Sequence, residues 1–203
     1  MNQLLKEHLA KLNPTGIRWD DMTEDQKEAL RREWDAVVGN PRNLTCTCPR
    51  HFCENNHNCQ FCMATHRSYG SLPDCLRLVD DKLNAEVPLE KRHNIHSHMN
   101  NNQPVAINRE DYHNRIAEAV KHDPNAMEAG RQRAKVWHDL VRDPENVKCR
   151  CKKTDCRFHG NCTKCIALHR AFDGFPACCE SIHDKIAAAI LAYRAEQAEA
   201  KAE

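Results

Sequence analysis

Two short stretches of the sequence concentrate cysteine and histidine at fixed intervals. The stretch from Cys149 to His169 has the spacing C-x-C-x(4)-C-x(5)-C-x(2)-C-x(3)-H, and the stretch from Cys46 to His66 repeats it. A further cysteine lies nine positions after each histidine, as Cys75 and Cys178. Thiolate and imidazole groups at short intervals are the preferred donors of zinc sites, so both stretches are predicted to bind metal.

The two stretches are related by an offset of 103 residues without a gap. The same offset pairs residues outside them, such as Asn43 with Asn146, and Arg67 with Arg170 immediately after the two histidines. The chain is therefore predicted to be a tandem repeat with seven metal donors in each unit. The predicted ligands are Cys46, Cys48, Cys53, Cys59, Cys62, His66 and Cys75 in the first unit, and Cys149, Cys151, Cys156, Cys162, Cys165, His169 and Cys178 in the second.

Seven donors are an awkward number for one tetrahedral ion. Two zinc ions need eight bonds, which seven donors supply if one thiolate bridges the two ions. A single ion, held by four cysteines or by three cysteines and the histidine, is the alternative. An iron–sulfur cluster and copper(I) also accept sets of thiolates and stay open.

The repeat pattern, and not their chemistry, distinguishes the adjacent residues Cys178 and Cys179. The offset places Cys178 opposite Cys75 and Cys179 opposite Leu76. A free cysteine behaves as a small apolar residue, which suits the position of a buried leucine. Cys178 is therefore predicted to be the ligand.

Composition favours metal over disulfides. The thirteen cysteines are an odd number, and the N-terminal segment MNQLLKEHLAKL is charged and amphipathic, unlike a secretory signal. We therefore expect a cytoplasmic protein. Aromatic content of 5% and a mean hydropathy of −0.79 predict thin cores that need staples, and no apolar run reaches the roughly 20 residues of a membrane span.

The net charge of the chain argues against a strongly basic surface of the kind that binds nucleic acid. The formal net charge is +1 with all cysteines neutral. Ligand cysteines lose their protons, so twelve thiolates and four zinc ions would bring the net charge to about −3. A mildly acidic protein is not typical of nucleic-acid binders.

Apolar periodicity and capping residues predict a mainly α fold of helix, Cys/His loop and helix in each unit. Thr23 with Gln26 three positions later forms a capping-box pattern, and Asp123 followed by Pro124 has the form of a helix start. The predicted domains are 1–86 and 109–203, joined by a polar linker over 87–108 that contains His93, His96 and His98. We interpret these histidines as linker residues, with a weak extra metal site as the alternative. Helices are predicted over 3–12, 23–38, 62–69, 73–83, 108–121, 123–142 and from about 177, with fraying after 194.

Two resemblances follow from the motifs. TDCRFHGNCTKCIALHR with FPAC in the second unit, and CENNHNCQFCMATHR with LPDC in the first, resemble small cysteine-rich bacterial proteins that carry a C-x-C…C…HGNC-x-x-C-x-x-x-HR…P-x-C signature. The first unit departs from it at His57, which stands opposite Gly160. This resemblance implies metal binding in a bacterial cytosol and no assigned activity. The order of cysteines also loosely resembles the fungal binuclear zinc cluster, which implies nucleic-acid binding.

No nucleophile–base pair, phosphate loop or paired acid motif in the sequence indicates an enzyme. The leading hypothesis is a tandem zinc-binding protein that acts as a non-catalytic interaction or regulatory module for another protein. The alternatives are a nucleic-acid-binding zinc-cluster protein, for which Lys152 and Lys153 give a basic segment, and a metal-handling or thiol protein.

Overall fold

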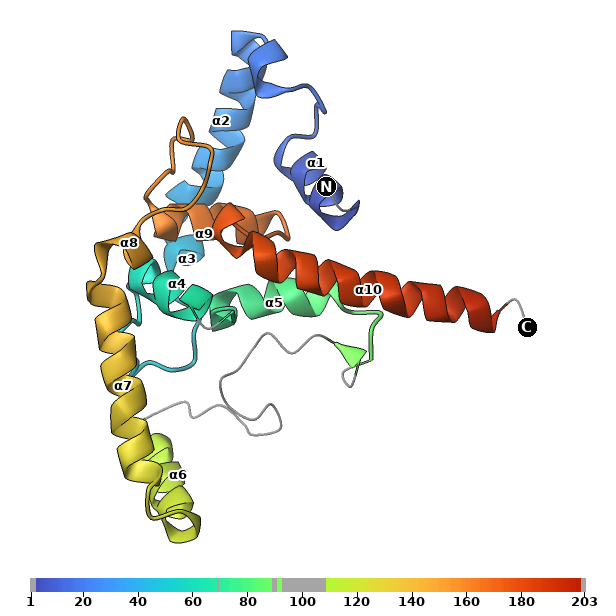
Figure 1. Cartoon of the computed structure of the whole chain (residues 1–203). Helices are drawn as coiled ribbons and strands as arrows, with labels where there is room; N and C mark the ends of the chain where they lie inside the picture. The colour runs from blue at the N-terminus through green and yellow to red at the C-terminus, as the bar shows by residue number, and fades with distance from the viewer. Residues whose placement is uncertain (1–2, 69, 89–90, 93–108, 202–203) are drawn as a thin grey trace. The chain divides into compact units, whose positions relative to one another are not determined.

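The computed structural model of the chain describes residues 3–68, 70–88, 91–92 and 109–201. These residues are mainly helical, which confirms the mainly α part of the predicted fold class, and they contain no strand (Figure 1). Most of the predicted linker, including His93, His96 and His98, lies outside the described residues.

The chain forms two compact units, each built from both repeats. The first unit comprises Met1–Thr45, Leu76–His93 and Arg150–Glu203, and the second comprises Cys46–Cys75 and Asn94–Cys149. Each unit thus joins the N-terminal helices of one repeat to the cysteine segment of the other. These units differ from the division into 1–86 and 109–203 that the order of the repeats suggests. One physical reason is charge: Asp35 of the first repeat pairs with Arg157 of the second, whereas the first repeat carries Glu54 at the position equivalent to Arg157.

In the first unit, α2 and α3 lie against α9. Val38 of α2 and Phe158 and Leu168 of the cysteine segment form a buried cluster, against which Cys156 and Cys165 also pack. The elements of this unit are α1 (Gln3–Leu12), η1 (Trp19–Asp21), α2 (Glu24–Gly39), α3 (Pro41–Leu44), most of α5 (Asp74–Leu83), α9 (Cys162–Ala171), η3 (Ala177–Cys179) and α10 (Glu180–Ala200).

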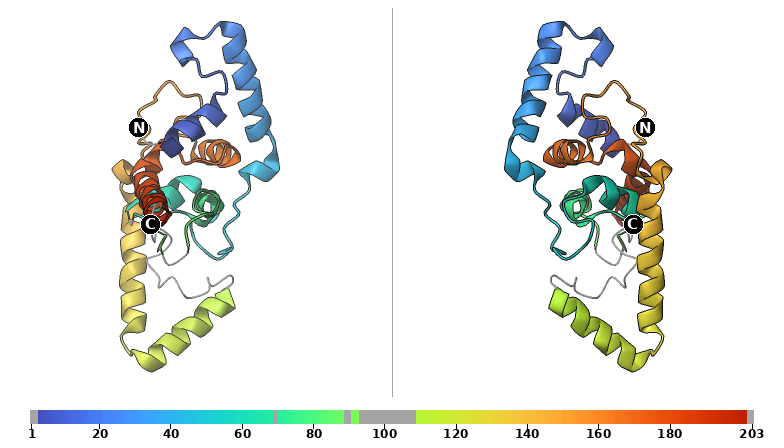
Figure 2. Two further views of the ribbon diagram at one scale, coloured as in Figure 1. Left: turned by 90° about the vertical axis from the view of Figure 1, so that its right-hand side faces the viewer. Right: turned by 90° about the vertical axis from the view of Figure 1, so that its left-hand side faces the viewer.

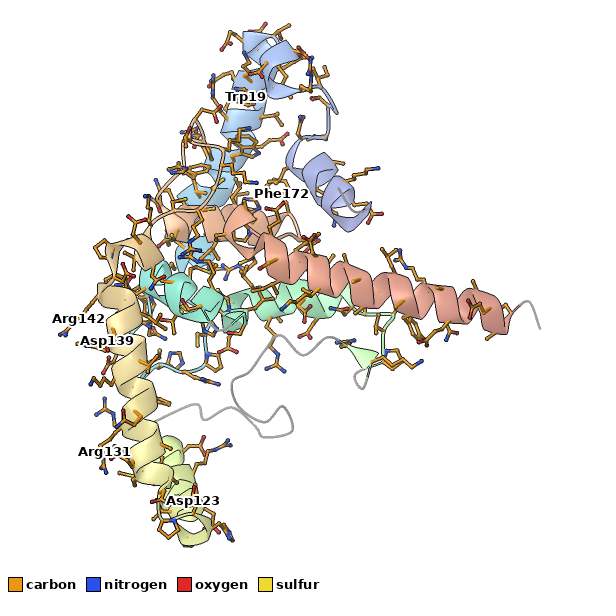
Figure 3. All side chains as sticks on the ribbon, viewed as in Figure 1. Trp19, Asp123, Arg131, Asp139, Arg142 and Phe172 are labelled. Carbon is orange, nitrogen blue, oxygen red and sulfur yellow. The ribbon has the colours of Figure 1, made fainter. Side chains whose placement is uncertain are left out.

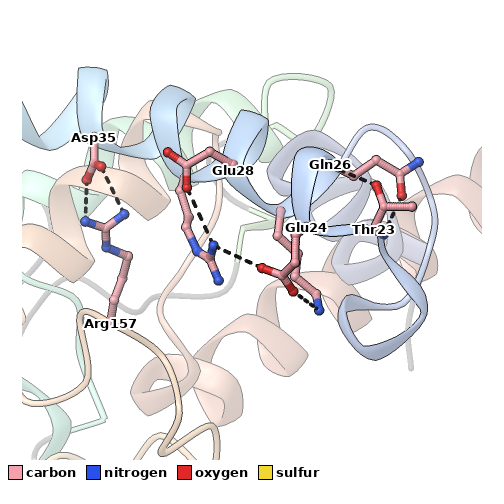
Figure 4. A network of polar contacts seen from close by, with 8 residues as sticks. Thr23, Glu24, Gln26, Glu28, Asp35 and Arg157 are labelled. Atoms are coloured by element: carbon pink, nitrogen blue, oxygen red, sulfur yellow. Dashed lines mark hydrogen bonds and ion pairs between the residues drawn. The ribbon is translucent and has the colours of Figure 1, made fainter.

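The start of α2 confirms the predicted capping box. Thr23 Oγ1 accepts from the Gln26 backbone N–H at 3.3 Å, and Gln26 Oε1 accepts from the Thr23 N–H at 2.9 Å (Figure 4). Further along α2, Asp35 forms an ion pair of 2.9 Å with Arg157 of the cysteine segment. The local sequence therefore sets where α2 begins, and a contact between repeats holds its second half.

Apolar side chains of α5 and α10 are buried in the first unit, among them Leu76 and Val79 on α5 and Ile182, Ile186 and Ile190 on α10. The helix α10 continues to Ala200, beyond the point at residue 194 where fraying is predicted. Exposed ion pairs link this last part to the segment after α5: Arg194 with Glu86 at 2.5 Å, and Glu196 with Lys91.

The second unit is built around α7, which contacts α4, α6 and α8. Its elements are α4 (Cys59–Ser68), the first residues of α5, α6 (Arg109–His122), α7 (Ala126–Arg142) and α8 (Pro144–Val147), and α6 and α7 meet at a sharp bend (Figure 2). The predicted start of α7 at Asp123 is wrong. Asp123 lies in the turn before the helix, where its carboxylate accepts from the Asn125 N–H, and Asn125 is the N-cap (Figure 3).

Helix bounds follow the offset of 103 residues. The short helices α3 and α8 occupy equivalent positions, as do α4 and α9. The side chain that caps each short helix is also equivalent, with Asn40 accepting from the Arg42 N–H and Asp143 accepting from the Glu145 N–H. Similar local sequence has produced similar local structure in the two halves of the chain.

Left-handed backbone conformation also recurs at equivalent positions. His57 has a φ of 63° and Gly160, opposite it, has a φ of 79°, while Gly70 has a φ of 62° and Asp173, opposite it, has a φ of 55°. Each repeat thus places glycine at one of these two positions and a side-chain-bearing residue at the other. Both loops therefore have the same left-handed conformation at these two positions, although glycine occupies a different one of the two in each repeat.

Gly160→Ala should destabilise the protein by about 1 kcal/mol, because an L residue is disfavoured at this φ. Nothing lies within 4 Å of an added Cβ at Gly160, so backbone conformation alone is responsible. His57→Gly should be stabilising by about 0.5 kcal/mol, since relief of backbone strain exceeds the added entropy of the unfolded chain. Denaturant midpoints of the variants measure both effects. Gly39→Ala is the matched control, with an open Cβ position and no left-handed φ, and it should not destabilise.

Candidate metal centre

Each cysteine segment carries three of its predicted donors on one helix. Cys59, Cys62 and His66 lie at positions i, i+3 and i+7 of α4, which places them along one helix face. An asparagine starts each of these helices: Asn58 accepts from the Phe61 N–H at 3.2 Å, and Asn161 accepts from the Lys164 N–H at 3.1 Å. The equivalent donors on α9 are Cys162, Cys165 and His169.

The loop before each helix turns tightly around one cysteine. The Cys53 N–H donates to the Arg50 carbonyl at 3.1 Å, and the Cys53 carbonyl accepts from the Asn56 N–H at 2.9 Å. Cys156 has the equivalent two bonds, at 3.3 Å and 2.8 Å. These turns direct the loop cysteines back toward the helix that follows.

The last donor is positioned by the turn after the histidine. The His66 carbonyl accepts from the Ser71 N–H at 2.9 Å, and His66 Nδ1 lies 2.9 Å from Ser71 Oγ. In the second repeat, the His169 carbonyl accepts from the Gly174 N–H at the same distance. The chain is thereby returned toward the cysteines, with Cys75 in the first turn of α5 and Cys178 in η3.

The two segments group their thiols in the same way. Burial, and then the thiols around it, raise the pKa of Cys62 far above its usual range, and the same causes act on Cys165. The neighbours that act on each central thiol occupy equivalent positions. The first thiol cluster is Cys48, Cys53, Cys59, Cys62 and Cys75, and the second thiol cluster is Cys151, Cys156, Cys162, Cys165 and Cys178.

The other four predicted donors lie close to these clusters in sequence and are all half-buried. Cys46 is near enough to Cys48 to contribute to the raised pKa of that thiol. Cys149 is the last residue of the second unit, whereas the second thiol cluster belongs to the first unit. His66 is oriented by Ser71, and His169 stands at the equivalent position of α9.

The donor chemistry of both clusters fits zinc, which favours thiolate and imidazole ligands. Within the described part of the chain, no three cysteine, histidine, aspartate or glutamate side chains are already arranged to hold an ion.

Arg67 and Arg170 immediately follow the predicted ligand histidines, at equivalent positions of the two repeats. Both are half-buried, and each donates to a backbone carbonyl at a short helix of the other repeat. Arg170 Nη2 donates to the Asn43 carbonyl at 2.7 Å, and Arg67 Nη2 donates to the Asn146 carbonyl. In both cases the arginine of one repeat therefore donates to the other repeat and not to its own.

One polar neighbour of the first thiol cluster was missed by sequence reasoning. Cys48 Sγ donates to Asp74 Oδ2 at 3.2 Å. The pKa of Cys48 is raised to about 12, first by burial and also by this carboxylate, against the lowering effect of the Arg50 backbone. The available signal was the position of Asp74, directly before a predicted ligand in the first turn of a helix.

Comparisons with protein-family models, with curated proteins and with solved structures found no match to this chain. The likeness to small cysteine-rich bacterial proteins and to the fungal zinc cluster therefore stays at the level of motifs. No helix within the described residues is long and apolar enough to cross a membrane.

The structure sharpens the expected difference between Cys178 and Cys179. Cys179 is buried with 1% of its surface exposed, like the equivalent Leu76 at 0%, whereas Cys178 is half-buried in the second thiol cluster. Cys178→Ser should lose metal from the second cluster. Cys179→Ser should keep full metal content and lose about 1–2 kcal/mol through burial of a hydroxyl. Metal analysis and thermal unfolding of both variants test this, and equal metal loss in both would contradict the assignment.

Proposed function

We propose that this chain is a tandem metal-binding protein that holds zinc at two thiol clusters and serves as a non-catalytic interaction or regulatory module. The observation that carries the proposal is the equivalence of the clusters. Four cysteines at the same positions of each repeat lie around one central thiol, Cys62 or Cys165, and the central thiols lie on equivalent helices.

The number of donors supports a structural role for the metal. A catalytic zinc ion keeps a coordination position open for water or substrate, whereas a structural ion is fully ligated by the protein. Each repeat offers seven predicted donors, enough to fill one site or, with a bridging thiolate, two. The metal would then stabilise each unit, and the two repeats would offer a partner protein two related binding sites.

Metal analysis of protein purified without oxygen tests this proposal. We expect zinc, with equal amounts at the two clusters. Cys62→Ser should remove the metal of the first cluster, Cys165→Ser that of the second, and the double variant both. Cys179→Ser is the matched control and should leave the metal content of both clusters unchanged. Metal content that is unaffected by both central substitutions would refute the proposal. Detection of iron and inorganic sulfide in place of zinc would show that the thiol clusters hold iron–sulfur clusters.

Nucleic-acid binding is a second candidate, favoured by cations around one aromatic ring. Trp19 stacks on Trp34, with ring centroids 5.8 Å apart. The side-chain cations of Lys27, Arg31 and Lys153 lie 5.9, 5.3 and 5.5 Å from the centroid of the Trp19 ring. Glu24 pairs with two of these cations, which offsets their charge (Figure 4). Retention on heparin that falls with salt and is lost in Lys153→Ala would support this candidate.

The metal-handling alternative makes a different prediction about exchange. A transport or storage protein must release its ions, whereas a structural site retains them. Incubation with a weak chelator separates these roles, since only a metal-handling protein should lose its metal within minutes.

A further inference from the structure

The two thiol clusters differ in one charged neighbour. Asp74 of α5 touches the first cluster, with Oδ2 3.2 Å from Cys48 Sγ. The offset of 103 residues places Ala177 opposite Asp74, so the second cluster has no carboxylate at this position. The repeats are alike in all seven predicted donors and unlike here.

We propose that Asp74 is an oxygen ligand of the first thiol cluster, so that the two clusters bind metal through different donor sets. This inference rests on the proposed metal-binding function and names a ligand that the repeat pattern cannot show. It follows from the position of the carboxylate, its surroundings and the number of donors.

The position suits shared coordination. Two ligands of one tetrahedral zinc ion, with bonds of about 2.3 Å to sulfur and about 2.1 Å to oxygen, lie about 3.6 Å apart. The observed Cys48–Asp74 distance of 3.2 Å is close to this value. Asp74 also directly precedes Cys75, whose thiol belongs to the same cluster, so both residues project from the first turn of α5.

The surroundings of the carboxylate call for a cation. Asp74 is half-buried, and among the described residues its side chain makes one polar contact, with the Cys48 thiol. A carboxylate this close to the first thiol cluster is well placed to bind a cation held there, since buried charges are stable when they are paired or coordinate metals.

The donor count points the same way. Two four-coordinate ions need eight bonds, and seven donors supply them only with a bridging thiolate. Asp74 raises the first cluster to eight donors and removes the need for a bridge, whereas the second cluster still requires one. An oxygen ligand also favours divalent zinc over copper(I), which prefers sulfur alone.

Residue-resolved alkylation of the zinc-loaded, full-length protein tests this inference. Zinc protects ligand thiols from iodoacetamide, and mass spectrometry reports the rate at each cysteine. Asp74→Ala and the isosteric Asp74→Asn should speed alkylation of the first thiol cluster by about 10- to 100-fold, with the second unchanged. Asp74→Cys, which restores a donor, should restore protection. Asp155→Ala is the matched control, since Asp155 is an exposed carboxylate between Cys151 and Cys156.

The outcomes separate this inference from the function it rests on. If Asp74→Asn matches Asp155→Ala while zinc protects both clusters, Asp74 is not a ligand and the metal-binding proposal stands. Failure of Asp74→Cys to restore protection would likewise overturn direct ligation. If zinc protects neither cluster in the unmodified protein, the proposed function itself fails. Ala177→Asp provides the reciprocal test and should slow alkylation of the second cluster.

Discussion

Removal of metal from the full-length protein should abolish its cooperative thermal unfolding. Metal is to be removed with a strong chelator under reducing conditions, and unfolding followed by circular dichroism and calorimetry. The reason is that the candidate ligands are part of the packing. Cys156 and Cys165 contact the buried cluster of Val38, Phe158 and Leu168, so their sulfur atoms help to hold α2 against the second cysteine segment.

The expected effect is larger than that of any single contact. Structural zinc contributes about 10–16 kcal/mol in small metal-dependent domains, which exceeds the typical total stability of a domain. Return of zinc should restore the transition, and Cys179→Ser protein should lose and regain its transition in the same way, with a lower midpoint. An unchanged transition in demonstrably metal-free protein would show that packing alone holds both units.

The pH dependence of stability should reverse when metal is removed. Protons compete with metal for thiolates, so the metal-bound protein should lose stability as the pH falls. In any folded metal-free form, the pKa of Cys48 is raised from about 9 to about 12. A raised pKa stabilises the folded state at pH values below the unfolded pKa, and this contribution is lost as the pH rises from about 9 toward 12. Chemical unfolding across both pH ranges would detect the two opposite trends.

The two halves of the chain, 1–92 and 109–203, should fold together but not singly as monomers. Neither half contains a complete compact unit, because the first unit needs 1–45 with 150–203 and the second needs 46–75 with 109–149. Mixing the halves with zinc should therefore give a one-to-one complex with a cooperative transition. Each half alone should be unfolded or should form an exchanged homodimer. Light scattering and calorimetry distinguish these states.

A matched pair of variants tests whether the hydrogen bonds between the repeats hold the two halves together. Arg170→Ala removes a half-buried, charged hydrogen bond to the Asn43 carbonyl and should weaken association by about 10- to 100-fold. Arg194→Ala also removes a contact between the halves, but its ion pair with Glu86 is exposed and should contribute little. A half that unfolds cooperatively as a monomer would instead show that the repeat itself is the folding unit.

The sequence by itself determined the local structure. The capping pair of Thr23 and Gln26 predicts where α2 begins, because both hydrogen bonds are made within one turn. The helix predicted over 62–69 is present as α4, but it begins three residues earlier, at Cys59, and so carries Cys59 together with Cys62 and His66. The offset between the repeats also predicted the contrast between half-buried Cys178 and buried Cys179. The local prediction that failed was the start of α7, which begins at Ala126, after a turn in which the Asp123 carboxylate accepts from the Asn125 N–H.

Only the tertiary structure decided which helices pack on which cysteine segment. Arg67 and Arg170 are equivalent, as are their acceptors at Asn146 and Asn43, so these hydrogen bonds do not separate pairing within a repeat from pairing between repeats. The ion pair of Asp35 with Arg157 does separate them, since Glu54 stands opposite Arg157 in the first repeat, but only the folded chain shows that these side chains meet. The approach of Asp74 to Cys48 was also beyond the pattern, because the two residues are 26 positions apart and meet only through folding of the loop between them. The repeat thus predicts what the two cysteine segments share, and the folded chain shows where they differ.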